Sequence, residues 1–76
     1  MKNLNWVVAR NSSNIRRFAW DNGTLIVEFL SGQVYRYEGV PVEKFSEFCC
    51  SQSKGQYFAR SIRGQYGYSK LVSEMR

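Results

Sequence analysis

Apolar and polar positions alternate most clearly in the middle of the chain, where they predict antiparallel strands. Asn22-Gly23 separates two apolar-rich runs, and this dipeptide is typical of a type I′ hairpin turn, whose two central residues need positive φ. A two-residue turn places Phe18 opposite Val27. The same register places Arg17 opposite Glu28, so apolar side chains gather on one face of the hairpin and charged side chains can pair on the other.

The next connection, around Ser31-Gly32, decides which side chains of a third strand face the core. A two-residue loop would place Arg36 opposite Val27 and bring charge into the apolar face. A loop of three residues, with Gly32 in a left-handed conformation, places Tyr35 opposite Val27 instead. Because side chains alternate with a period of two, we choose the three-residue loop. The result is a three-stranded meander with one apolar face: Phe18, Trp20, Leu25, Val27, Phe29, Tyr35 and Tyr37.

A first helix is predicted to cover this face. Pro41 has the fixed φ that suits a first helical position. Phe45, Phe48 and Cys49 follow at helical spacing, with charged residues on the rest of the helix surface. The helix therefore has one apolar side that can pack on the sheet.

A second helix is predicted from Ser53, as its N-cap, to about Ile62, with Gly64 as its stop. Its expected apolar side consists of Phe58, Ala59 and Ile62. Arg60 and Arg63 would lie one turn apart on the other side. Residues 4–9 and 65–76 could each add a strand. The fold class is therefore α+β: an antiparallel meander of three strands, or of four or five where the ends pair with it, covered by two short helices.

The length and composition narrow the range of functions. With 76 residues the chain forms one domain, residues 1–76, and its 43% apolar content can build a core. The absence of histidine excludes ordinary His-based zinc sites and Ser/Cys–His catalysis. The adjacent Cys49-Cys50 pair lacks the spacing of a zinc or redox motif, which favours one core thiol and one partly exposed thiol in a reducing compartment. No apolar run is long enough for a membrane span or a signal sequence, so we expect a cytoplasmic protein.

The net charge of +5 lies at the two ends of the chain. Residues 1–14 carry +2, residues 15–53 carry −1 and residues 54–76 carry +4. From Lys54 to Lys70 there is no acidic residue, and basic and amide side chains alternate with aromatic ones, as on a surface that follows phosphates. The alternative is a solvated helix face. The candidate nucleic-acid-binding residues are Lys54, Arg60, Arg63, Tyr66, Lys70, Arg36 and Arg16.

Tyr35 and Tyr37 allow two interpretations. Aromatic side chains on a sheet can stack on unpaired bases. Because the strand register turns both tyrosines towards the core, we favour a structural role, with their hydroxyls reaching water.

An ordered series of motifs resembles the KTSC domain, a short module named after the C-terminal extension of some lysyl-tRNA synthetases. The series covers roughly residues 8–68 and contains Ser12-Ser13-Asn14-Ile15, Trp20-Asp21, Leu25-x-Val27-x-Phe29, Ser31-Gly32, Tyr35-x-Tyr37, Val40-Pro41 and Ser53-Lys54-Gly55-x-Tyr57-Phe58. The family pattern has Tyr-Asp where this chain has Trp20-Asp21. The resemblance implies a module that also occurs alone in bacterial and phage proteins, with RNA binding suggested and no catalytic signature.

We expect a non-catalytic module that binds nucleic acid, RNA rather than DNA, through the second helix and the tail. The alternative is a protein-interaction module, such as a phage-type effector that docks on an acidic surface of a host protein, with Trp6 and the tail tyrosines offering an aromatic–arginine hot spot for the partner. Catalysis would need Arg63 and Tyr66 to act with carboxylates that look like helix-surface residues. We expect no catalytic residue, metal or cofactor, and self-association remains possible because the end strands offer pairing edges.

Overall fold

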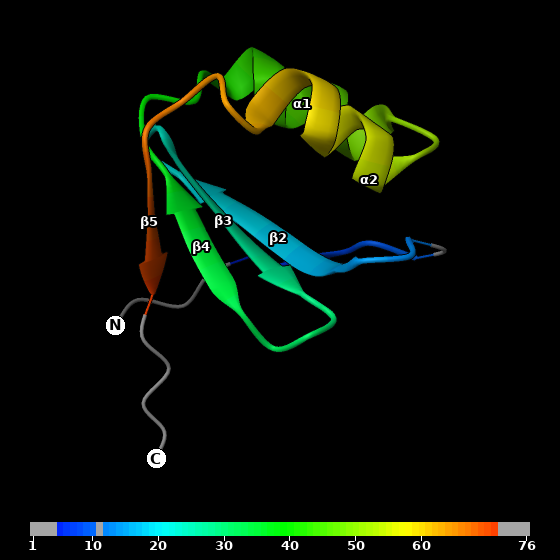
Figure 1. Ribbon diagram of the computed structural model, residues 1–76. Helices are drawn as coiled ribbons and strands as arrows, with labels where there is room; N and C mark the ends of the chain where they lie inside the picture. Colours follow the sequence, from blue (N-terminus) through cyan, green and yellow to red (C-terminus); the bar gives the residue numbers. More distant parts are fainter. Residues whose placement is uncertain (1–4, 11, 72–76) are drawn as a thin grey trace.

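The computed structural model describes residues 5–10 and 12–71, which form an antiparallel sheet covered on one face by helical segments (Figure 1). The strands are neighbours in chain order, from β1 to β5. Their bounds are β1 Val7–Val8, β2 Ile15–Asp21, β3 Thr24–Phe29, β4 Val34–Tyr37 and β5 Tyr68–Leu71. The helical segments are α1 Val42–Cys50, α2 Lys54–Tyr57 and a π-helical turn, η1, Phe58–Ile62. The predicted α+β class is confirmed.

The first hairpin has the predicted register. Phe18 pairs with Val27, and both residues of the Asn22-Gly23 turn have positive φ, 51° and 86°. On the opposite face Arg17 Nε donates to Glu28 Oε1 at 2.6 Å. Pairing of apolar and charged side chains on separate faces therefore sets this register.

The three-residue loop after β3 is also confirmed. Val27 pairs with Tyr35, and the Phe29 N–H donates to the Gln33 carbonyl across the loop at 2.9 Å. Gly32 adopts φ 98°, a left-handed conformation that glycine takes without strain. This register turns Tyr35 and Tyr37 towards the helices.

Both ends of the chain add an edge strand, as the sequence allowed. β1 pairs antiparallel with β2, and β5 pairs antiparallel with β4. The register of β5 places Lys70 opposite Tyr35 and Tyr68 opposite Tyr37. Directly opposed residues share a face, so Tyr68 and Lys70 lie on the side of the sheet that the helices cover.

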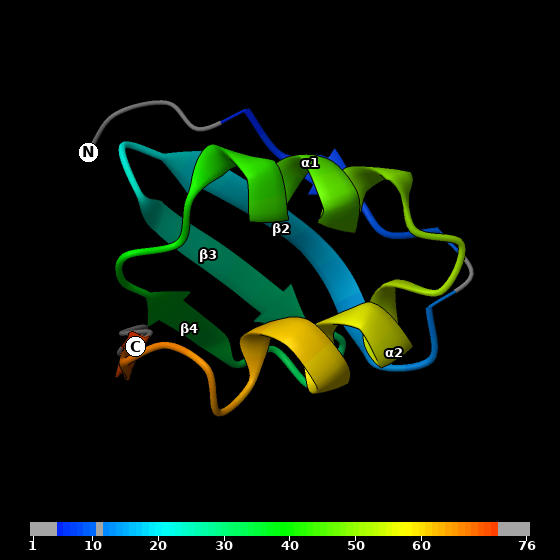
Figure 2. The ribbon, with the colours of Figure 1, turned by 90° about the horizontal axis from the view of Figure 1, so that it is seen from above.

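The first helix begins one residue later than predicted. Pro41 has ψ 157° and precedes the helix in extended conformation, so α1 starts at Val42. Proline fixes φ and leaves ψ free, and the Pro41 carbonyl accepts the first helical hydrogen bonds, from the amides of Lys44 and Phe45. Figure 2 shows α1 lying across β2 and β3.

The second helix starts as predicted. The Ser53 hydroxyl accepts from the Gln56 amide at 3.4 Å. The helical stretch ends at Ile62, two residues before Gly64, which has φ 80°. Its second half, however, widens into the π-turn η1, in which the Arg63 amide reaches back five residues to the Phe58 carbonyl at 2.9 Å.

This widening overturns two details of the predicted helix. Ala59 is exposed, whereas Phe58 and Ile62 are buried, because the wider turn rotates the intervening side chains away from their α-helical positions. Arg63 has ψ 127° and lies beyond the last helical residue, so it does not share a helix face with Arg60.

The core lies between the sheet and the helical segments. Its largest fully buried side chains are Phe18, Phe48, Ile15, Leu25, Ile62, Val27 and Val40. Cys49 is half-buried and Cys50 is exposed, and both are free thiols. None of the helical segments within residues 5–10 and 12–71 has the length and hydrophobicity that crossing a membrane requires.

Candidate functional site

Five aromatic side chains form a closed cluster between the sheet and η1. Each ring contacts two others of the set, at centroid distances from 5.5 to 5.7 Å. In order around the cluster they are Phe29, Tyr35, Tyr68, Tyr37 and Phe58, and we call them the aromatic cluster. Three of its members come from β3 and β4, one from β5 and one from η1, so the fold assembles it from segments that are distant in sequence.

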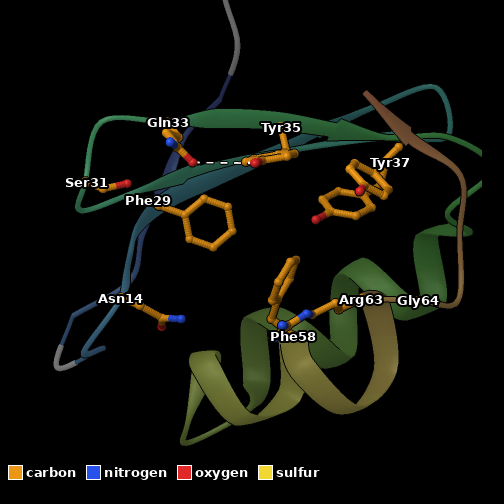
Figure 3. A pocket seen from close by; sticks show the side chains of 10 residues that line it. Asn14, Phe29, Ser31, Gln33, Tyr35, Tyr37, Phe58, Arg63 and Gly64 are labelled. Atoms are coloured by element: carbon orange, nitrogen blue, oxygen red, sulfur yellow. Dashed lines mark hydrogen bonds between the residues drawn. The ribbon is translucent and has the colours of Figure 1, made fainter. Parts of the chain in front are cut away.

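A cavity of about 380 Å³ opens at the aromatic cluster (Figure 3). Besides the five aromatic residues its lining comprises Asn14, Ser31, Gln33, Arg63 and Gly64. No carboxylate is among these ten described residues. The cavity therefore combines aromatic walls, neutral hydrogen-bonding groups and one cation, which is a typical composition of a small-ligand site.

The polar groups at the cavity come from different segments. Ser31 and Gln33 belong to the loop between β3 and β4, and the Asn14 carbonyl accepts from the amide of that loop's Leu30 at 2.8 Å. The Arg63 side chain follows η1 and lies beside Phe58 (Figure 3). The loop and Asn14 thus present carboxamides and a hydroxyl, and the segment after η1 presents a guanidinium.

Tyr37 is a neutral hydrogen-bonding group at the cavity. Burial is the largest cause that raises the pKa of Tyr37 to about 12; the neighbouring Tyr35 and Tyr68 act in the same direction, and Arg63 opposes them. The Tyr35 hydroxyl donates to Gln33 Oε1 at 3.4 Å. Tyr37 therefore stays protonated at neutral pH and can donate a hydrogen bond.

The π-turn η1 determines where Arg63 lies. Because the turn accommodates one more residue than an α-helical turn, the chain leaves the helix at Arg63 in extended conformation and Gly64 then turns it towards β5. Phe58, at the start of the same turn, is 4% exposed and forms part of the cavity wall. Single π-turns within helices are frequent at functional sites.

The other predicted basic residues divide into two groups. Lys70 lies on the cavity side of the sheet, beside Tyr35, and Arg60 is exposed on η1. Arg36 lies on the opposite face and donates through Nε to Glu38 Oε2 at 2.6 Å. Arg16 Nε lies 3.6 Å from Glu28 Oε2 on that opposite face. Among the described residues, the ion pairs occupy Arg16, Arg17 and Arg36 and involve none of Arg60, Arg63 and Lys70.

Lys54 and Tyr66 lie away from the cavity lining. Lys54 Nζ donates to the Ser51 carbonyl at 2.6 Å, which satisfies a carbonyl that the end of α1 leaves unpaired. Tyr66 is half-buried and packs against the core. The contacts of Lys54 and Tyr66 therefore indicate that both side chains stabilise the fold.

Several residues at the cavity were not predicted as site residues. From the sequence, Asn14 was identified only as a motif position, Ser31 as a loop and motif position, and Phe29 as a core and motif position. The alternation along β4 did place Tyr35 and Tyr37 on this face. Tyr68 could be assigned to it only once the pairing of β5 was known, and no turn signal sets that pairing.

Two other kinds of site, a metal site and an activated cysteine, are not found among the described residues. Within residues 5–10 and 12–71, no three Cys, Asp or Glu side chains come together in a way that could hold a metal ion. Burial raises the pKa of the Cys49 thiol, and the adjacent Cys50 acts in the same direction, so Cys49 is not an activated thiolate.

Comparison with known proteins identifies relatives along most of the chain. A lysine–tRNA ligase of Nostoc sp. is 46% identical over 48 residues, which are 63% of this chain and 9% of the ligase. An uncharacterized protein of Stutzerimonas stutzeri is 38% identical over 61 residues, 78% of this chain and 86% of that protein. The crystal structure of a KTSC domain protein from Yersinia pestis matches with a TM-score of 0.83 and 29% identity, covering 92% of this chain and 100% of that one.

These matches differ in extent. The alignment with the ligase covers less than a tenth of the ligase, whereas the alignments with the two small proteins cover most or all of their length. The model of the KTSC domain family matches residues 11–66, which include β2 to β4, α1, α2, η1 and nine of the ten residues at the cavity. This chain therefore belongs to the KTSC domain family.

Proposed function

We propose that this chain is a non-catalytic module that binds single-stranded RNA at the aromatic cluster. The observation that carries the proposal is the juxtaposition of five aromatic rings with Arg63 around one open cavity. Unpaired bases stack on aromatic side chains while arginine and lysine neutralise phosphates. The cavity supports a binding role over catalysis because no carboxylate at it could exchange a proton with Arg63 or the tyrosines.

The distribution of charge supports the same surface. Arg63 lines the cavity, Lys70 lies opposite Tyr35 and Arg60 is exposed on η1, and the ion pairs of the described residues involve none of the three. Arg16 and Arg36, by contrast, lie on the far face beside glutamates. We therefore assign phosphate contacts to the first three residues and none to the other two.

One argument favours a single strand over a duplex, and a second favours RNA over DNA. A cavity of about 380 Å³ has no room for a duplex, so its ligand must present unpaired bases, as RNA loops and ends do. The chain is also similar to part of a lysine–tRNA ligase, an enzyme whose name states that it acts with a tRNA. A module attached to such an enzyme would meet RNA.

The test compares two double variants that remove the same charge from opposite faces. We expect Arg60→Ala, Arg63→Ala to weaken binding of a fluorescent single-stranded RNA in anisotropy titrations at several salt concentrations. The slope of log Kd against log salt should flatten by about 1.4, since each lost phosphate contact removes about 0.7 for a single strand. Arg16→Ala, Arg36→Ala is the matched control and should keep the wild-type slope. Wild-type affinity and slope in the first variant would overturn the proposal.

A protein-interaction module is the second candidate, and one contact favours it. Arg17 lies 4.0 Å from the ring centre of Trp6 on the outer face, next to Val8, which is 58% exposed. Tryptophan and arginine are enriched in the centres of protein interfaces. If this face binds a protein, affinity purification after nuclease treatment should recover one partner in stoichiometric amount, and Trp6→Ala should lose it.

A further inference from the structure

We propose that Tyr68 is the member of the aromatic cluster on which an RNA base stacks, and that Lys70, two residues further along β5, contacts the phosphate next to that base. This inference rests on the proposed RNA-binding function and adds the two residues that hold the base and the backbone. It starts from a difference in exposure among the five rings.

Tyr68 is the exposed member of the aromatic cluster. Its exposed fraction is 63%, whereas Tyr37 and Phe58 are 5% and 4% exposed. Phe29 and Tyr35 are half-buried. Stacking of a base needs free ring surface, and Tyr68 offers more of it than the other four rings do. A base can therefore reach Tyr68 without any rearrangement of the fold.

Two neighbouring rings hold the Tyr68 ring in place. Its centroid lies 5.7 Å from that of Tyr35 and 5.7 Å from that of Tyr37, with interplanar angles of 48° and 31°. Tyr37 in turn packs edge-to-face against the buried Phe58, at 5.5 Å. Because these contacts restrict the Tyr68 ring before a ligand arrives, binding costs less side-chain entropy than it would at an unsupported surface tyrosine. Tyr68 is thus a preformed stacking surface.

The position of Tyr68 in the sheet leaves room for a strand of RNA. β5 is the edge strand beside β4, at the end of the strand order (Figure 1). Three of its four residues are exposed. A single strand can therefore lie along β5, while the helical segments cover the rest of the same sheet face.

Lys70 is placed to contact the backbone of such a strand. Tyr68 and Lys70 are two residues apart on β5, so their side chains leave the same face of the sheet about 6.6 Å apart along the strand. The lysine side chain is long and flexible and carries a compact charge, which suits contact with a phosphate beside a stacked base. Arg63 lines the same cavity as Tyr68, and the ion pairs of the described residues involve neither cation. Two unpaired cations from different segments therefore accompany the stacking ring.

The experiment compares Tyr68→Leu with Tyr68→Phe, two variants that keep a large apolar side chain and differ in the flat ring. Fluorescence anisotropy measures their binding to a labelled oligouridylate and to an abasic RNA of equal length. The wild-type protein should bind the oligouridylate about tenfold more tightly than the abasic strand, which lies within the range for one stacked base. Tyr68→Leu should lose this difference. Tyr68→Phe should retain it, because stacking does not need the hydroxyl.

Lys70→Ala tests the backbone contact separately. It should flatten the slope of log Kd against log salt by about 0.7 and leave the ratio of affinities for the two strands unchanged. Arg36→Ala, on the opposite face of the sheet, is the matched control and should change neither. A wild-type slope in Lys70→Ala would overturn the assignment of Lys70.

The outcomes separate this inference from the proposed function. If Tyr68→Leu keeps the wild-type preference for the oligouridylate while Arg60→Ala, Arg63→Ala still weakens binding, the inference is overturned and RNA binding stands. If Tyr68→Leu weakens binding of both strands equally, the ring acts through the fold and not through stacking, which also overturns the inference. No binding of any strand would overturn both the inference and the proposed function.

Discussion

The parts of the sheet under α1 and under η1 are both rich in aromatic side chains, yet they differ in how completely the rings are covered. Under α1, Phe18 and Phe48 stack with their centroids 4.0 Å apart and are both fully buried. Under η1, neighbouring rings of the aromatic cluster are 5.5 to 5.7 Å apart and enclose a cavity. The same residue type thus forms core in one half and an open wall in the other.

The covering segments explain this difference. α1 is a nine-residue regular helix that places Phe45 and Phe48 against the sheet at helical spacing. η1 has five residues and a widened turn, and it places only Phe58 and Ile62 inside. The number of aromatic residues on a sheet face therefore does not distinguish a closed core from an open cavity. In this fold the distinction comes from the length and regularity of the helical segment that packs on the face.

The largest predicted effect is a difference in stability between the two halves. Phe48→Ala should lower the free energy of unfolding by about 3–5 kcal/mol, because it opens a void in a fully buried stack. Tyr68→Ala should lower it by less than about 1 kcal/mol, since most of that side chain is already in solvent. Urea unfolding followed by circular dichroism measures both values.

A loss from Tyr68→Ala as large as that from Phe48→Ala would mean that the aromatic cluster is ordinary core. If Phe48→Ala does not fold, Phe48→Leu supplies the comparison, because it retains a large apolar side chain and should still lose more stability than Tyr68→Ala.

The next effect compares the buried Tyr37 under η1 with the half-buried Tyr57, which stacks on Phe48, at alkaline pH. Burial raises the pKa of Tyr37 to about 12, and burial with the hydrogen bond to Glu47 raises that of Tyr57 to about 12. An unfolded tyrosine loses its proton near pH 10, so between pH 10 and 12 the unfolded state binds fewer protons and the free energy of unfolding falls as pH rises. For Tyr37 the full loss is about 2–3 kcal/mol.

Phenylalanine substitutions isolate each contribution. Tyr37→Phe and Tyr57→Phe should each reduce the decline in stability between pH 9 and pH 11, measured by urea unfolding at fixed pH. An unchanged decline in Tyr37→Phe would show that its hydroxyl is hydrated through the cavity and that the half under η1 is wetter than its burial indicates.

The predictability of the structure from sequence follows the range of the interactions involved. The hairpin register and the three-residue loop were predicted because local turn chemistry and the alternation of side chains both act on neighbouring residues. The π-turn was not predicted, because a single inserted residue in a helix has no distinct pattern of side chains. The predicted position of Arg63 on the helix was therefore wrong. The cavity depends on how β5 and the region around Asn14 approach the sheet, which are long-range contacts without a local signal.

The smallest expected effect on stability comes from Gly55, where α2 approaches the residues that precede β2. A Cβ atom there would lie 2.9 Å from Asn14 Oδ1. Alanine favours a helix over glycine by about 1 kcal/mol, and the exposed Asn14 carboxamide can rotate away. Gly55→Ala should therefore change the free energy of unfolding by less than about 1 kcal/mol, while the Asn14 side-chain amide signal shifts in the ¹⁵N spectrum.

Gly67→Ala is the matched control for Gly55→Ala, because a Cβ at Gly67 meets nothing within 4 Å, and it should leave the Asn14 amide signal unchanged. A loss of several kcal/mol in Gly55→Ala would show that Asn14 is held rigidly against α2. The cavity would then be bounded on that side by fixed core packing, and the difference between the two halves of the sheet would be confined to the end where Arg63 and Tyr68 lie.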